Sequence, residues 1–386
     1  MARILHVVTS PRAEGTPRLV LDWLTVKEHQ QAVVFLSGSP PDLLGEFLAS
    51  GAAIATAETI VPGPRKFWRM MRLVQREVRS FRPDLVVAWP MGFSHWIFLG
   101  ARAAGSRAAL LSHCGNPSGT AWPYGPTLTW ICLWTTGLCR GRVVACSRYV
   151  KARFREIPLV PNSIVGVAYN SVQTGRVAER ADAARRGRAA VGPFRVVMVA
   201  TLESHKDHAT LIRAAALLRH ADRAFEFLLA GQGALEQPLK ALAARLRVAD
   251  RVKFLGARRD VPELLGQSDL FVLSTTPNEG RPGVILEALA AGLPIVASDV
   301  APLREVLEDG RWGALVPAGD AEALARELLK WSRAGRPNAD RMAAGRAHAA
   351  RFTPERMIAD YLREGRRDVG GGVTRRGARA EPTSRA

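Results

Sequence analysis

The stretch "NEGRPGVILEALAAGLPIVASD" (residues 278–299) places Glu279 and Glu287 on either side of a Gly–Arg–Pro–Gly segment. That segment predicts a loop, and the apolar residues after it predict a helix over Gly283–Ala291. The first N–H groups of a helix have no partners within the helix, so they favour a phosphate. The two carboxylates can accept hydrogen bonds from sugar hydroxyls. The stretch therefore predicts a site where a nucleotide sugar lays its diphosphate on the helix start.

An alternative interpretation makes Glu279 an exposed loop residue and Glu287 a capping or solvent-facing one. Glu287 stands between Leu286 and Ala288 in a largely apolar helix. A carboxylate buried at such a position needs partners, which favours the binding interpretation.

Short apolar segments typical of buried strands alternate with helix-length segments along the chain. In the first half these segments are "ILHVV", "QAVVFL", "DLVVAW", "AALLS" and "VVACS". In the second half they are "FRVVMVA", "FEFLLAG", "RVKFLG", "DLFVLS" and "PIVAS", with helices predicted over Asp207–Arg219 and Ala234–Arg247 as well as after Glu279. This alternation predicts an α/β protein with two Rossmann-like, doubly wound domains facing each other across a cleft.

The predicted division has five parts. Residues 1–175 form an N-terminal, acceptor-side domain, 176–192 a linker, 193–350 a C-terminal nucleotide-sugar domain, 351–365 a helix that crosses back to the first domain, and 366–386 a basic disordered tail. Ligands of open parallel sheets bind at the carboxyl ends of the strands, so functional residues are expected just after strands. No G-x-G-x-x-G fingerprint occurs, and a dinucleotide is not expected.

Lys206 lies in "VVMVATLESHKDHATLI" (residues 196–212), in a loop between a strand end and an apolar helix. An ammonium group there can neutralise a departing diphosphate. Taken alone, a loop lysine is more often a solvated charge.

With these motifs, the chain resembles the family 4 glycosyltransferases of the GT-B type. The family's E-x7-E signature matches Glu279 and Glu287 within "EGRPGVILEALAAGLPIVAS", and its Gly-rich and F-L-G strand ends match "LLAGQGALEQPLKALA" and "KFLGARRDVPELL". Weaker similarity extends to "FRPDLVVAWP", "VVACSRYVKARF", "VAYNSV" and "RFTPERMIADYL". The resemblance implies a retaining enzyme that transfers a sugar from a UDP- or GDP-sugar and needs neither a metal ion nor a cofactor.

The resemblance also implies roles for individual residues. His113, in "LLSHCGNP", and Glu279 match the family's catalytic positions next to the donor sugar, Glu287 the ribose-binding position, and Lys206 a diphosphate-binding position. The remaining donor-binding positions implied are Gly15, Thr201, Ala257, Gly280, Gly283 and Val284.

Two positions depart from the family pattern. Thr201 replaces an arginine that would contact phosphate, and Glu14 replaces the first glycine of a Gly–Gly loop. Lys206 is then expected to carry more of the charge, helped by Arg281 or Arg12. A carboxylate at Glu14 is unfavourable beside a diphosphate unless it points away.

The net charge of +19 indicates an anionic partner, a solvated arginine-rich surface or both. A basic helix with interleaved aromatic residues is predicted in "GPRKFWRMMRLVQREVRSFRPD" (residues 63–84), and "AWPYGPTLTWICLWTTGLC" (residues 121–139) is rich in tryptophan. Such segments suit an anionic membrane surface or pack as ordinary helices on the sheet. We expect a glycan or lipid-linked acceptor, with the protein cytoplasmic or peripheral on the inner membrane face and no nucleic acid partner.

The four cysteines show no metal-binding spacing and are expected as free thiols of a reducing compartment. The N-terminal residues predict a strand and no signal peptide. Two other functions stay open: a polyanion-binding protein on a degenerate transferase fold, and a GT-B nucleotide-sugar epimerase.

Overall fold

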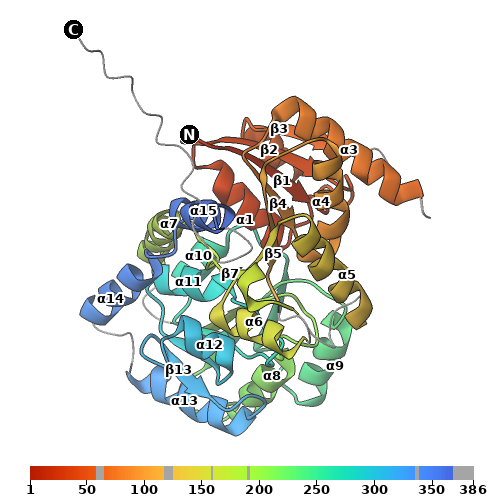
Figure 1. Cartoon of the computed structure of the whole chain (residues 1–386). Helices are drawn as coiled ribbons and strands as arrows, with labels where there is room; N and C mark the ends of the chain where they lie inside the picture. Colours follow the sequence, from red (N-terminus) through yellow and green to blue (C-terminus); the bar gives the residue numbers. More distant parts are fainter. Residues whose placement is uncertain (58–64, 117–124, 158–159, 189–191, 335–338, 368–386) are drawn as a thin grey trace.

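The computed structural model describes the chain except for residues 58–64, 117–124, 158–159, 189–191, 335–338 and 368–386. The described residues form two lobes, each built on a parallel sheet with helices on both faces (Figure 1). We call them the N lobe, around strands β1–β7, and the C lobe, around strands β8–β13. The two-lobed α/β architecture predicted from the alternation of strands and helices is confirmed.

The sheet of the N lobe has the strand order β3-β2-β1-β4-β5-β6-β7. Its strands are β1 (Arg3–Val8), β2 (Gln30–Phe35), β3 (Ala53–Thr56), β4 (Leu85–Trp89), β5 (Ala109–Cys114), β6 (Arg142–Ala145) and β7 (Val165–Val167). Its helices are α1 (Gly15–Leu24), α2 (Leu44–Ala49), α3 (Arg65–Phe81), α4 (Ser94–Ala103), α5 (Gly125–Leu138) and α6 (Arg148–Arg153), with short 3-10 turns η1 (Met91–Phe93), η2 (Phe154–Glu156) and η3 (Asn162–Ile164).

The sheet of the C lobe has the related order β10-β9-β8-β11-β12-β13. Its strands are β8 (Phe194–Val199), β9 (Phe225–Ala230), β10 (Val252–Gly256), β11 (Leu270–Leu273), β12 (Ile295–Ser298) and β13 (Ala314–Val316). Its helices are α8 (His208–Leu217), α9 (Glu236–Arg245), α10 (Val261–Gly266), α11 (Gly283–Ala290), α12 (Ala301–Val306), α13 (Ala321–Ala334) and α14 (Ala339–Ala349). The helices expected after β8, β9 and β11 are therefore present, with ends that differ by one or two residues.

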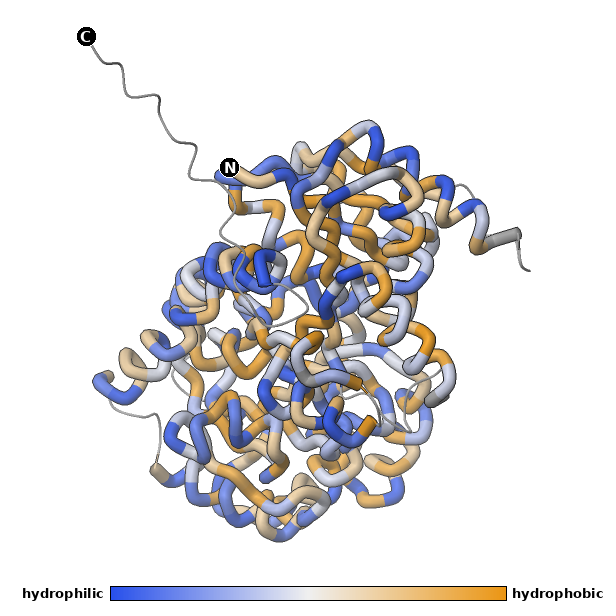
Figure 2. Tube along the Cα trace, viewed as in Figure 1, coloured by the Kyte–Doolittle hydropathy of each residue, from blue (hydrophilic) through white to orange (hydrophobic). Residues whose placement is uncertain are grey.

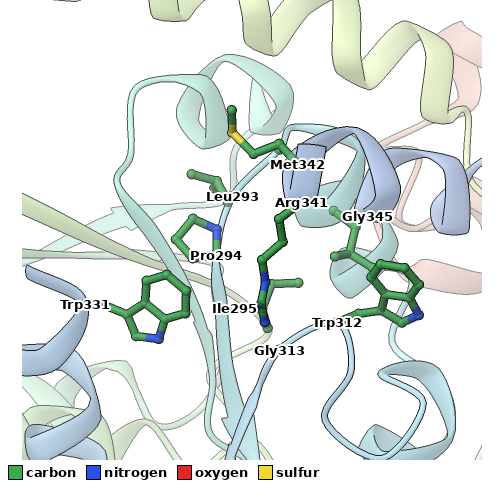
Figure 3. Close-up of a pocket in the computed structure, with 11 residues that line it drawn as sticks. Leu293, Pro294, Ile295, Trp312, Gly313, Trp331, Arg341, Met342 and Gly345 are labelled. Atoms are coloured by element: carbon green, nitrogen blue, oxygen red, sulfur yellow. The ribbon is translucent and has the colours of Figure 1, made fainter. Parts of the chain in front are cut away.

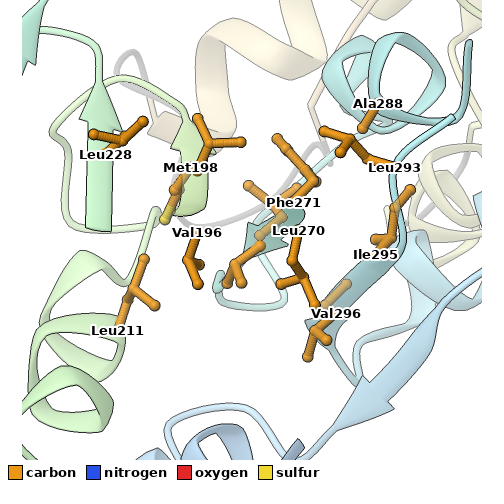
Figure 4. Close-up of a cluster of buried hydrophobic side chains, with 14 of the residues drawn as sticks. Val196, Met198, Leu211, Leu228, Leu270, Phe271, Ala288, Leu293, Ile295 and Val296 are labelled. Carbon is orange, nitrogen blue, oxygen red and sulfur yellow. The ribbon is translucent and has the colours of Figure 1, made fainter. Parts of the chain in front are cut away.

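The central strands are almost entirely buried because helices cover both faces of each sheet. In the C lobe, side chains of β8, β11 and β12 meet those of α8 and α11 in one continuous core (Figure 4). Burial of this apolar surface supplies most of the stabilisation and leaves the carboxyl ends of the strands free to carry polar loops.

Helices α7 (Thr174–Arg186) and α15 (Pro354–Gly365) lie beside both lobes (Figure 1). Much of the segment expected to be a linker, 176–192, is thus the helix α7, which packs on α10 and α11. Helix α15 contacts α1, β5 and β6 of the N lobe, and its Tyr361 is fully buried there. Of the predicted disordered tail, residues 368–386 lie outside the described part of the chain.

An ion pair buried between β6 and α15 anchors the crossing helix. Nη2 of Arg142 lies 3.0 Å from Oε2 of Glu364, and both side chains are less than a tenth exposed. Gly166 makes room for this carboxylate, because a Cβ there would lie 2.3 Å from Oε2 of Glu364. Helix α15 is therefore part of the N lobe.

Candidate active site at the interlobe junction

The carboxyl ends of the two sheets meet where the lobes touch, and we call this region the interlobe junction. The loop after β11 lies against the loop after β5, since a Cβ on Gly280 would lie 1.7 Å from the carbonyl oxygen of Gly115. The hydroxyl of Tyr149 donates to the carbonyl of Pro277 at 2.9 Å. Only a residue without a side chain fits at position 280, so close approach of the lobes is built into the sequence.

Lys206 and Glu279 form an ion pair at this junction. Lys206 ends the loop after β8, Glu279 lies in the loop after β11, and β8 and β11 are adjacent strands. Both side chains are largely buried, at 12% and 7% exposure. Two residues that the sequence assigned to the donor site are therefore brought together, and each neutralises the other.

Glu287 is the fifth residue of α11, one turn after the helix start at Gly283. Its side chain is half-buried, and among the described residues no hydrogen bond or ion pair holds its carboxylate. Burial raises its pKa, and the charge of Arg18 partly opposes that shift. The carboxylate keeps its accepting capacity for hydroxyl donors from a ligand.

The N lobe contributes two charged residues that the sequence analysis missed. Arg18 and Asp22 lie one turn apart on α1, and both interact electrostatically with Glu287 of the C lobe. Burial, and after it the charge of Glu287, raises the pKa of Asp22 to about 7. No sequence signal links α1 to α11, because only the folding of two separate lobes brings them together.

His113 occupies the end of β5 and is 1% exposed. Its Nδ1 lies 2.7 Å from the hydroxyl of Tyr361, and its ring centre lies 4.7 Å from that of Trp89, with the two rings tilted by 33°. Burial lowers its pKa to about 3, so the imidazole is neutral across the physiological range. A Cβ added to Gly115 would lie 3.2 Å from Nε2, so this nitrogen faces the loop that reaches Gly280.

The other expected donor-binding residues follow strand ends as well. Gly15 begins α1 with open space around it, and Thr201 is exposed after β8. Ala257 is exposed after β10. Gly283 begins α11 and Val284 follows it, so their N–H groups stand at the start of the helix. All of these positions lie at the carboxyl edges of the sheets.

The expectation that Arg281 helps to neutralise phosphate is not supported by its position. Its guanidinium lies 4.6 Å from the ring centre of Tyr169 and 4.1 Å from that of Phe352. One nitrogen donates to the carbonyl of Asn170 at 3.0 Å, and the side chain is 4% exposed. Burial lowers its pKa to about 10. Arg281 therefore links the loop after β11 to the segment after β7. The sequence gives no sign of this contact, because 111 residues separate Arg281 from Asn170.

Glu14 and Arg12 form an exposed ion pair at 3.1 Å, with both side chains 55% exposed. The carboxylate makes no capping hydrogen bond to α1. Glu14 thus has a cation beside it, and its carboxylate is largely exposed to solvent.

The glycine-rich loop after β9 supports the loop that carries Lys206. Gly231 has φ +152, and a Cβ there would lie 1.9 Å from the carbonyl oxygen of Ala200. Leu202 donates its N–H to the carbonyl of Gln232 at 3.1 Å. The backbone contact fixes where the chain turns toward Lys206, which explains the glycine at this position.

The junction thus gathers a lysine, free N–H groups at the start of α11 and a half-buried carboxylate. Such a set can bind an anion and stabilise negative charge that develops on it. Within the part of the chain that the structure describes, no group of three metal-ligating side chains occurs. A separate apolar pocket of about 30 Å³ lies away from the junction, between β12 and α14, and Trp312, Trp331 and Arg341 are among its lining residues (Figure 3).

Comparison with protein families gives two matches that follow the lobes. Residues 193–333 match the model described as glycosyl transferases group 1. Residues 22–176 match the model described as glycosyltransferase family 4. The two matches cover most of both lobes and leave α14 and α15 outside.

Three known proteins illustrate the similarity. The amylovoran biosynthesis glycosyltransferase AmsK of Erwinia amylovora is 35% identical over 147 residues, 36% of each chain. The lipopolysaccharide core biosynthesis glycosyltransferase LpsE of Rhizobium meliloti is 34% identical over 164 residues, 42% of this chain and 46% of LpsE. These alignments span less than half of either relative. Anabaena Alr3699/HepE, solved with UDP and glucose, has 20% identity and a TM-score of 0.76 over 94% of this chain and 98% of its own.

Proposed function

The chain belongs to the family 4 glycosyltransferases, and on that premise we propose that it transfers a sugar from a nucleoside diphosphate sugar to a glycan or lipid-linked acceptor. The observation that carries the proposal is that the Lys206–Glu279 ion pair and, on the helix that follows Glu279, the carboxylate of Glu287 both lie at the interlobe junction. Relatives named for amylovoran and lipopolysaccharide core biosynthesis support an acceptor on the way to a surface polysaccharide.

In the proposed complex the donor diphosphate lies on the start of α11. The N–H groups of Gly283 and Val284 have no partners within the helix and can donate to phosphate oxygens. Lys206 supplies a positive charge beside them, and the half-buried Glu287 accepts from the ribose hydroxyls. Glu279 and His113 then face the sugar.

The reaction places negative charge on the departing nucleoside diphosphate. The N–H groups at the helix start are fixed before the reaction, so they stabilise that charge without reorganising. Lys206 adds its positive charge once the diphosphate has drawn it partly away from Glu279. We propose that this electrostatic pair takes the part that a divalent ion plays in other sugar transfers. Membership of the family supports retention of the anomeric configuration.

Donor choice can be tested by thermal shift with UDP-, GDP- and ADP-sugars on the wild type and on Glu287→Ala and Lys206→Ala. We expect one nucleotide class to raise the melting temperature of the wild type, with a smaller shift for both variants. Binding to RNA with no response to any nucleotide sugar would instead support a polyanion-binding protein. Inversion of the configuration at one sugar carbon of the nucleotide sugar, in the absence of an acceptor, would support an epimerase.

The N lobe carries a basic surface that fits an anionic membrane. Trp68 is 62% exposed on α3, and Arg69, Arg72, Arg76 and Arg79 are exposed along the same helix. Hydrophilic residues recur along this projecting helix (Figure 2). We propose that α3 docks on the inner leaflet, where anionic lipids attract arginine and the interface accepts tryptophan.

Helix α5 adds an apolar stripe to the same lobe. Ile131, Trp134 and Leu138 are 46%, 62% and 80% exposed at helical spacing. Helices α3 and α5 both pack on α4, so the basic and the apolar helices belong to one layer. None of the described helices has the length and hydropathy needed to cross a bilayer. We propose peripheral attachment through this layer, which brings the junction to a lipid-linked acceptor.

Sedimentation with vesicles tests the membrane surface. We expect binding to vesicles that contain phosphatidylglycerol, little binding to phosphatidylcholine alone, and loss of binding at high salt. The double variant Arg72→Gln/Arg76→Gln should bind about tenfold or more weakly, at roughly 1 kcal/mol per arginine. The control Arg326→Gln/Arg333→Gln removes the same charge from α13 and should bind normally. If both double variants lose vesicle binding equally, or if binding does not depend on salt, the proposal that α3 is the membrane-binding surface is contradicted.

A further inference from the structure

The contact between Tyr361 and His113 joins helix α15 to the candidate active site. Tyr361 lies on α15, 248 residues after His113, and its hydroxyl is 2.7 Å from Nδ1 of the imidazole. Both side chains are almost fully buried. The contact therefore cannot be replaced by water without opening the N lobe.

The direction of this hydrogen bond follows from what each group must satisfy. Among the described residues, Nδ1 of His113 is the hydrogen-bond partner recorded for the Tyr361 hydroxyl. If the imidazole donated from Nδ1, the phenol proton would be left without an acceptor in the core. An unsatisfied buried donor costs about 1–3 kcal/mol. The favoured arrangement has Tyr361 donating and Nδ1 accepting.

A neutral imidazole carries one proton, so an accepting Nδ1 leaves the proton on Nε2. The low pKa of His113, about 3, keeps the ring neutral at any pH where the protein works. Nε2 faces Gly115, whose carbonyl lies against Gly280 of the loop between β11 and α11 (residues 274–282), which we call the donor loop. The nitrogen that faces the interlobe junction is thus a hydrogen-bond donor.

Neighbouring aromatic rings fix the orientation of this pair. Trp89 stacks on Tyr361 with ring centres 5.7 Å apart, and it contacts His113 in a tilted arrangement with ring centres 4.7 Å apart. The indole N–H of Trp89 donates to Nδ1 of His6 at 3.2 Å. Nε2 of His6 lies 3.0 Å from Oε1 of Gln31, whose amide nitrogen donates to two backbone carbonyls. The two carbonyl contacts fix which end of the Gln31 amide accepts, so the proton of His6 is on Nε2 and Trp89 is held in place.

We infer that Tyr361 is a positioning residue, whose hydroxyl keeps the imidazole proton of His113 on the nitrogen that faces the interlobe junction. His113 then acts on the donor sugar as a hydrogen-bond donor and does not accept a proton from the acceptor. The role of His113 in catalysis rests on the proposed function. The location of its proton does not depend on that function. Helix α15, outside both family matches, becomes part of the active site.

The first test reads the proton directly. In protein labelled with ¹⁵N-histidine, the His113 signals are assigned by their loss in His113→Gln. We expect the wild type to show the proton on Nε2 throughout pH 6–8, and Tyr361→Phe to shift toward the other tautomer. A proton on Nδ1 in the wild type, or an unchanged tautomer in Tyr361→Phe, overturns the inference. Because no substrate is needed, this result stands whether or not the chain transfers a sugar.

The second test separates positioning from packing. Glu364→Gln weakens the docking of α15 through its ion pair with Arg142 but keeps the Tyr361 hydroxyl. We expect Tyr361→Phe to lower kcat about 10–100-fold with little change in KM for the donor, and Glu364→Gln to lower the melting temperature with near-normal kcat. Equal losses of kcat in the two variants indicate a structural role alone and overturn the inference. A wild type that neither binds nor turns over any nucleotide sugar refutes the proposed function and leaves the tautomer result intact.

Discussion

Nζ of Lys206 and a carboxylate oxygen of Glu279 are paired at the interlobe junction, although 73 residues separate them in the sequence. The pair is nearly buried, so removing one partner leaves the other as an uncompensated charge in a poorly solvated place. In the proposed complex, the donor diphosphate therefore has to draw Lys206 at least partly away from Glu279. In the ion pair the charges of Lys206 and Glu279 compensate each other, and both side chains stay in place at the junction until a ligand binds.

Lys206→Ala tests the two roles of this lysine. We expect kcat to fall about 10²–10³-fold, because a charge aimed at the departing diphosphate is lost. We also expect a lower melting temperature, because the Glu279 carboxylate loses its partner. The double variant Lys206→Ala/Glu279→Gln should regain stability without regaining activity. Turnover and melting temperature, measured together on all three proteins, check this; recovery of activity in the double variant would contradict the catalytic role.

Glu287→Gln should weaken nucleotide binding without lowering stability, in contrast to Lys206→Ala, which should lower the melting temperature. The half-buried carboxylate lacks a protein partner among the described residues and has a raised pKa, so its removal should leave the melting temperature unchanged or higher. Nucleotide affinity should fall about tenfold or more, since a hydrogen bond to a charged group contributes roughly 1.5–3 kcal/mol.

Calorimetry with UDP and its 2′-deoxy analogue sharpens the test of Glu287. The wild type should prefer the nucleotide that carries both ribose hydroxyls, and Glu287→Gln should lose that preference. An equal preference in the two proteins would place the ribose elsewhere.

The central strands and the helices that follow them could be predicted from the sequence because each is a continuous apolar segment or an amphipathic one. The edge strands β3, β7 and β13 could not, because they have only three or four residues and their side chains are less buried than those of the central strands. The family motifs identified Lys206, Glu279 and Glu287 because each is a local pattern after a strand.

Relationships across the lobes could not be predicted in the same way. Arg281 carries a charge beside the donor loop, which favoured a phosphate-binding role, yet its guanidinium lies between Tyr169 and Phe352. Asp22 and Arg18 looked like ordinary helix residues until α11 was placed near them. Local spacing determines which strand end bears a residue, but the packing of the lobes determines what it meets.

Asp22 predicts a pH dependence of stability. Its pKa is raised from 3.8 to about 7 by burial and by the charge of Glu287, so the folded protein holds this proton more tightly than the unfolded chain. Stability is therefore lost as the pH rises from about 4 toward 7. Asp22→Asn, which keeps a neutral group, should raise the free energy of unfolding at pH 8 by about 1–3 kcal/mol, with a smaller gain at pH 4.5. Denaturant melts at both pH values check this, and an equal gain at the two would assign the effect to packing.

Glu305 predicts a coupling between the lobes that can be measured without the reaction. It lies at the end of α12 in the C lobe, and its two carboxylate oxygens accept from the N–H groups of Arg148 and Tyr149 at 2.8 and 2.9 Å. These are the first N–H groups of α6 in the N lobe, where an anion also favours the helix dipole. Glu305 therefore holds the lobes together beside the contact of Tyr149 with the donor loop.

We expect Glu305→Ala to lower the free energy of unfolding by about 0.5–2 kcal/mol, as for other lost helix caps. We also expect a larger radius of gyration by X-ray scattering and weaker nucleotide binding, since a smaller share of the molecules would have the lobes in contact. Saturating nucleotide should restore the radius of gyration. The control Glu322→Ala removes an exposed carboxylate of α13 and should change none of these quantities. If the radius of gyration of Glu305→Ala equals that of the wild type with and without nucleotide, the contact caps α6 without holding the lobes, and only the loss of stability should remain.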